Sequence, residues 1–97
     1  MSDVNGTLDQ RATIYGSFAI LASTAQHLRR HMHSAPNWPN LFPDQQEALD
    51  MIAAKLARIL CGDPNHFDSW HDIAGYAQLV ARRLDTPPKA TASADRP

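Results

Sequence analysis

The sequence is poor in the features that mark disulfide-stabilised, zinc-bound or membrane proteins. Its 97 residues include one cysteine, Cys61, which excludes an internal disulfide framework and a zinc site built from several cysteines. No apolar run approaches the roughly 18 to 20 residues that span a bilayer. The N-terminal stretch MSDVNGTLDQ lacks the basic and then apolar regions of a secretory signal. We therefore expect a cytoplasmic protein with no membrane partner.

Charge of neither sign is in clear excess. Nine Lys and Arg residues oppose ten Asp and Glu residues, for a net charge of −1, whereas a general nucleic-acid binder carries a basic surplus. A hydrophobic content of 43% with 20% charged residues is typical of a soluble globular domain. A single domain of this size is only marginally stable alone. We therefore expect a homo-oligomer without general nucleic-acid binding.

Three segments repeat apolar residues at helical spacing, and none shows strand alternation. They run from Thr7 to Ser34, from Asp44 to Cys61 and from Asp68 to Leu84. Gly16 interrupts the first segment, Asp44 is the predicted cap of the second, and Gly62 is placed to end it. The expected fold class is all-α, a compact bundle of three main helices with an interruption in the first.

The remaining segments divide the chain. Residues 1–6 are predicted to be a flexible N-terminus, and residues 7–85 a single helical domain. Residues 86–97, with the sequence TPPKATASADRP, are predicted to be a disordered tail. Between the first two helices, prolines flank Trp38, Leu41 and Phe42, which we expect to form a hydrophobic lid. The apolar helix faces predict the core, with Leu49, Ile52, Leu56, Ile59 and Leu60 on the second helix and Trp70, Ile73, Ala77, Val80, Ala81 and Leu84 on the third.

Polar residues occupy the opposite faces of the last two helices. Lys55 and Arg58 lie on the second helix, and Asp68, Asp72 and Tyr76 follow one line of the third at spacings of four. The short loop that ends at His66 favours antiparallel neighbours, so we expect these strips to converge. Lys55 and Arg58 can also simply pair with Asp68 and Asp72, and Asp68 can cap its helix. Gly75, costly within a helix, predicts close approach of another helix or a ligand.

Two sets of residues resemble known families. Arg11-x-x-x-Tyr15-Gly16, Lys55-x-x-Arg58-Ile and Asp68-Ser-Trp-x-Asp72-Ile-x-Gly75-Tyr76-Ala together resemble a family of small uncharacterised proteins common in phages and prophages. That resemblance implies a phage protein in the host-cell cytoplasm, serving nucleotide metabolism or countering host defences. A more distant likeness is to the MazG-like all-α NTP pyrophosphohydrolases. Glu47-x-x-Asp50 and Ser69-x-x-Asp72 match their metal-binding acids, with Ser69 in place of one carboxylate.

Three functions remain open. The preferred hypothesis is a binding protein, without cofactor or catalytic residue, that sequesters a phosphorylated nucleotide. Phosphates would meet Arg11, Lys55 and Arg58, the base would stack on Tyr15 or Tyr76, and His66, Asp68 or Asp72 would read its edge. The second is a pyrophosphohydrolase that holds Mg²⁺ on Glu47, Asp50 and Asp72. The third is an inhibitor that binds a host protein through the Trp38, Leu41 and Phe42 lid.

Overall fold

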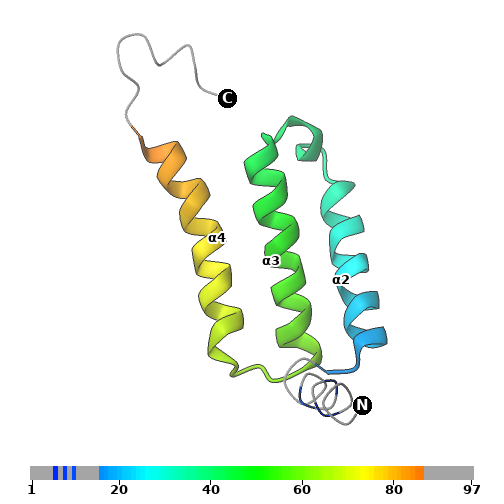
Figure 1. The fold of residues 1–97 in the computed structure, drawn as a ribbon. Coiled ribbons are helices and arrows are strands. Elements are labelled where there is room, and N and C mark those ends of the chain that lie inside the picture. Colours follow the sequence, from blue (N-terminus) through cyan, green and yellow to red (C-terminus); the bar gives the residue numbers. More distant parts are fainter. Residues whose placement is uncertain (1–5, 7, 9, 11–15, 87–97) are drawn as a thin grey trace.

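The computed structural model describes residues 6, 8, 10 and 16–86. Within this part the chain forms α2 (Phe18–His33), the short 3₁₀ helix η1 (Trp38–Asn40), α3 (Pro43–Cys61) and α4 (Phe67–Asp85), with no strand (Figure 1). The predicted all-α class is confirmed. The predicted helix start at Thr7 lies outside the described residues. So do residues 1–5 of the predicted flexible N-terminus and residues 87–97 of the predicted tail.

Gly16 separates α2 from the preceding segment, as its position in the periodic pattern predicts. Its φ of +87° lies in the left-handed region, where a residue with a Cβ is strained. A Cβ at Gly16 would also overlap the carbonyl oxygen of Cys61, the last residue of α3. Gly16 therefore lets the start of α2 lie directly against the end of α3, and α2 begins two residues later at Phe18.

Two polar contacts and one aromatic contact join α2, the lid segment and α3. His33 Nε2 donates to Asp50 Oδ1 at 2.7 Å, and the His33 ring packs on Trp38 with 4.3 Å between centroids. Gln46 Nε2 donates to the Trp38 carbonyl at 3.0 Å. Trp38 and Leu41 are half-buried, while Phe42 stays 40% exposed.

Both predicted acid caps are wrong. α3 begins at Pro43, and Gln45 Oε1 accepts the Phe42 backbone N–H at 2.9 Å. Proline suits the first helical position because its fixed φ is helical and its missing N–H needs no partner. Asp44 therefore lies in the first turn and pairs with Arg83 on α4. Asp68 likewise lies in the first turn of α4, which has His66 at its cap position.

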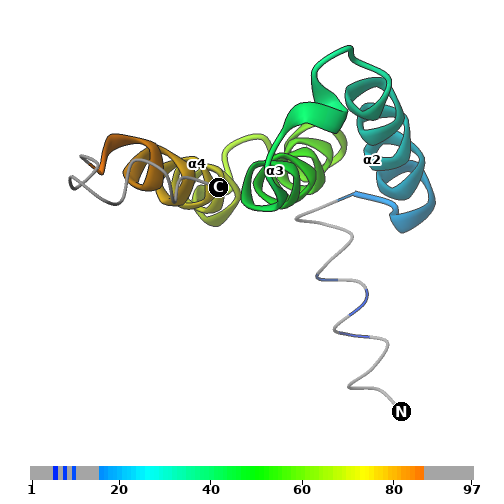
Figure 2. The same ribbon diagram turned by 90° about the horizontal axis from the view of Figure 1, so that it is seen from above.

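The helices form a single layer with α3 between α2 and α4, as the two views show (Figures 1 and 2). The buried residues are small and lie on these helices: Ala25, Ala48, Ala53, Ala57 and Ser69. The expectation that the large apolar residues form the core is wrong for several of them. Leu60 is 68% exposed and Trp70 is 54% exposed. One layer buries only the side chains between neighbouring helices, and its two broad faces remain open.

Enlarging a buried alanine of α3 tests this packing. Ala53 is fully buried, so Ala53→Leu is expected to lower the free energy of unfolding by about 1–3 kcal/mol through overpacking. The matched control is Ala74→Leu at an exposed position of α4, for which we expect a change within about 0.5 kcal/mol. Urea unfolding followed by circular dichroism measures both. Equal effects of the two substitutions would contradict the close approach of α3 to its neighbours.

Candidate functional site

Lys55 of α3 and Asp72 of α4 meet across the boundary between these helices. Lys55 Nζ lies 2.8 Å from Asp72 Oδ2, and the two side chains are 13% and 41% exposed. The five-residue connection Gly62–His66 turns the chain so that α4 runs back along α3. This contact confirms the predicted pairing of these two residues. Of the two aspartates considered as partners for Lys55, Asp72 is the one that it binds.

Basic groups surround the Asp72 carboxylate. Its pKa is lowered from the usual 3.8, first by the hydrogen bond from Lys55 and then by the charges of Lys55, His71 and Arg58, while desolvation acts in the opposite direction. Lys55 and Arg58 both place positive charge beside this carboxylate.

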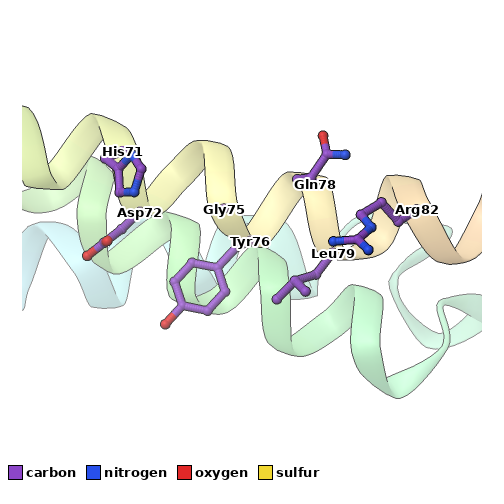
Figure 3. Close-up of a pocket in the computed structure, with 7 residues that line it drawn as sticks. All are labelled: His71, Asp72, Gly75, Tyr76, Gln78, Leu79 and Arg82. Atoms are coloured by element: carbon purple, nitrogen blue, oxygen red, sulfur yellow. The ribbon is translucent and has the colours of Figure 1, made fainter.

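A hollow of about 460 Å³ lies beside this cluster on α4. Its lining residues are His71, Asp72, Gly75, Tyr76, Gln78, Leu79 and Arg82. Asp72, Tyr76 and Leu79 project to one side of the helix, and Gln78 projects to the other (Figure 3). All seven residues lie on α4, so the hollow is a shallow depression along one helix. Arg82 supplies a further cation at one end.

Sequence reasoning missed three of these residues. His71, Gln78 and Arg82 are spaced at i, i+7 and i+11, with Gly75 at i+4, so they follow one line of the helix. That spacing was the available signal. The neighbouring line of Asp68, Asp72 and Tyr76 carries the more regular polar pattern and obscured it.

The other predicted ligand-binding residues lie near the start of α4 or outside the described part. His66 is half-buried, and its carbonyl accepts the Ser69 N–H at 3.2 Å. Asp68 is exposed one turn before Asp72. Arg11 and Tyr15 lie outside the described residues.

The three carboxylates assigned to a metal do not share one site. Asp50 accepts from His33, and its backbone carbonyl accepts from the Arg29 guanidinium, so it lies toward α2. Asp72 binds Lys55 on the α4 side. Glu47 lines a neighbouring hollow of about 310 Å³ that shares Tyr76 and Leu79 with the first. Among residues 16–86 no three His, Cys, Asp or Glu side chains are grouped to hold an ion.

Acid is expected to weaken the packing of α4 on α3. The pKa of Asp44 is lowered mainly by its hydrogen bond from Arg83, as that of Asp72 is by Lys55. Because both pKa values are lower in the folded state, their stabilisation is complete above pH 3.8, the usual value. It is lost as the pH falls through the folded values. Melting temperatures from about pH 6 to about pH 2 measure this loss. An Asp44→Asn, Asp72→Asn variant should lose less over that range, and an equal loss would contradict the assignment.

A family model matches residues 4–84, which include nearly all of α2, α3 and α4. This match covers more than half of the chain and fixes its family. The chain belongs to the DUF6378 family, a domain of unknown function. No curated protein and no solved structure matches this DUF6378 chain. None of its described helices has the length and apolar character needed to cross a bilayer.

Proposed function

We propose that this DUF6378 protein binds a phosphorylated nucleotide beside the α3–α4 boundary and sequesters it unchanged. We further propose that it is phage-encoded and acts on a nucleotide signal in the host cytoplasm. The observation that carries the proposal is the cluster of Lys55, Arg58 and His71 around Asp72, with Tyr76 one turn further along α4.

The phosphates are assigned to Lys55 and Arg58. An ammonium has three donors, and Asp72 takes one from Lys55 while holding its Nζ in place at 2.8 Å. Arg58 offers a planar guanidinium that suits bidentate binding of phosphate. Because Lys55 is only 13% exposed, its position is largely fixed before the ligand arrives, which lowers the entropy lost on binding.

The base is assigned to the α4 hollow. Tyr76 is half-buried and presents an aromatic ring, on which a base can stack. Gly75 supports a ligand here, because among the described residues no atom beyond its chain neighbours and its own helix backbone lies within 4 Å of where its Cβ would be. A glycine within a helix lowers stability by about 1 kcal/mol relative to alanine, and no neighbour in the described residues accounts for it.

Equilibrium dialysis of the full chain tests the proposal, against nucleoside triphosphates and cyclic oligonucleotides, first with Mg²⁺ and then with EDTA. We expect at least one nucleotide class to bind equally well in EDTA. Retention of none would overturn the proposal and favour a protein inhibitor that acts through Trp38, Leu41 and Phe42. Hydrolysis to a monophosphate only with Mg²⁺ would instead support a MazG-like pyrophosphohydrolase.

A further inference from the structure

The apolar face formed by α3 and α4 is open in the single chain. A groove of about 340 Å³ runs between the two helices, lined by eight apolar side chains and Gln45. Ala77 and Leu84 line it from α4 and Leu49 from α3. At 100° per residue, Ala77 and Leu84 lie on the opposite side of α4 from Gly75. The groove is therefore separate from the proposed nucleotide site.

The folded chain needs a permanent cover for this face. Its buried hydrophobic residues are four alanines, and no large side chain of the described residues is fully buried. Trp70, Leu84 and Leu49 are 54%, 45% and 39% exposed. Burying alanines alone offsets little of the entropy lost on folding. A cover that this fold always requires is best supplied by the chain itself, since a second copy is present wherever the first is made.

The order of residues on α4 makes this face complementary to itself. Consider two α4 helices packed antiparallel about a two-fold axis at Ala77. Trp70, seven residues before the axis, then lies opposite Leu84 of the second copy, seven residues after it. Ile73 lies opposite Ala81 of the second copy, so a large residue meets a small one. A parallel pairing would instead set Trp70 against Trp70 and Ala81 against Ala81, leaving large residues crowded and small ones apart.

We propose that two copies of this chain pair through this face, with α4 antiparallel to α4 about a two-fold axis at Ala77. The α3 and α4 helices of each copy then form a four-helix core that covers Trp70, Leu49 and Leu84. Such an interface is isologous and closes at the dimer. Two adjacent helices of 19 residues present a face of about 600 Å² in projection. That is the scale of a stable dimer, which buries roughly 600–1,000 Å² per partner.

The two-fold axis at Ala77 can be tested by placing opposite charges at this one residue. Ala77 is exposed in the single chain, so substitution there leaves the monomer's own packing intact. Ala77→Glu and Ala77→Lys, each alone, set like charges against each other at the axis and are expected to weaken the dimer at least about 100-fold. An equimolar mixture sets Glu against Lys and is expected to restore it. Gln78→Glu, at an exposed residue outside the groove lining, is the matched control and should leave the dimer unchanged.

Sedimentation equilibrium of the full chain gives the mass, and circular dichroism gives the helix content. We expect a wild-type dimer, or a larger even assembly whose mass falls when Ala77 is charged. A monomeric wild-type chain would overturn the proposal and assign the face to another occupant, such as residues 1–15 or a host protein. An Ala77→Glu protein that assembles as wild type does would also overturn it. If the single variants lose helix, the mixture still decides: recovered helix and dimer support the axis, and no recovery rejects it.

Discussion

Gly16→Ala is expected to lower the free energy of unfolding by at least about 2 kcal/mol, because two costs coincide at this residue. An L-residue at positive φ costs about 1–2 kcal/mol, and Gly16 has φ +87°. The added Cβ would in addition overlap the backbone carbonyl of Cys61, so the start of α2 would have to move away from the end of α3. Urea unfolding at one fixed protein concentration measures the change, since the stability of an oligomer depends on concentration.

The matched control for Gly16 is Gly75. Gly75 has open space where its Cβ would be, and it lies within α4. Gly75→Ala is therefore expected to raise the free energy of unfolding by up to about 1 kcal/mol. The same chemical change thus has opposite signs at the two positions. A Gly16→Ala protein as stable as wild type would contradict the close contact between α2 and α3.

Removing a cation at the candidate site should reduce nucleotide affinity about 10- to 100-fold. Hydrogen bonds to charged groups contribute about 1.5–3 kcal/mol, and both Arg58→Ala and Lys55→Gln remove such donors. Either change also removes a positive charge from the vicinity of Asp72, which weakens the attraction for phosphate. Isothermal titration with the nucleotide that dialysis identifies measures the affinity, and circular dichroism checks that the fold is intact.

Two variants distinguish binding at this site from a general effect of the protein's charge on affinity. Arg30→Ala removes the same charge from an exposed position of α2 and should leave affinity within about twofold. Gly75→Ala should weaken binding while stabilising the fold, because its methyl group occupies the place assigned to the ligand. An Arg58→Ala protein that binds as well as wild type would reject the assigned phosphate contact. An equal loss of affinity in Arg30→Ala would show that binding depends on the net charge of the protein and not on this site.

The sequence predicted the helices well because their signals are local. Apolar spacing, Gly16 and Gly62 are each properties of one short segment, and they placed the boundaries within a few residues. The Asp44 cap was wrong because proline and aspartate both suit a helix start, and at Pro43 the proline decides it. Burial was wrong because periodicity identifies an apolar face without identifying what covers it. Trp70 lies on such a face and is still 54% exposed.

The candidate site was predicted only in part, because the signals in the sequence are local. Lys55 and Asp72 could be paired from the loop length and the spacing along two helices, and the contact is present. Asp50 was grouped with Asp72 because of the likeness to the MazG-like enzymes. It lies instead toward His33, whose approach depends on how the lid turns the chain between α2 and α3. Such a contact between distant segments depends on tertiary packing, which spacing within one helix does not determine.

The most direct test of nucleotide sequestration is to recover the ligand after binding. The full chain is loaded with the retained nucleotide in Mg²⁺, separated from free ligand, heated to unfold it, and the released molecule is analysed by chromatography and mass. Sequestration predicts release of the unmodified nucleotide in proportion to the protein, and far less from Arg58→Ala. Release of a shortened or hydrolysed product would contradict sequestration and make this protein an enzyme.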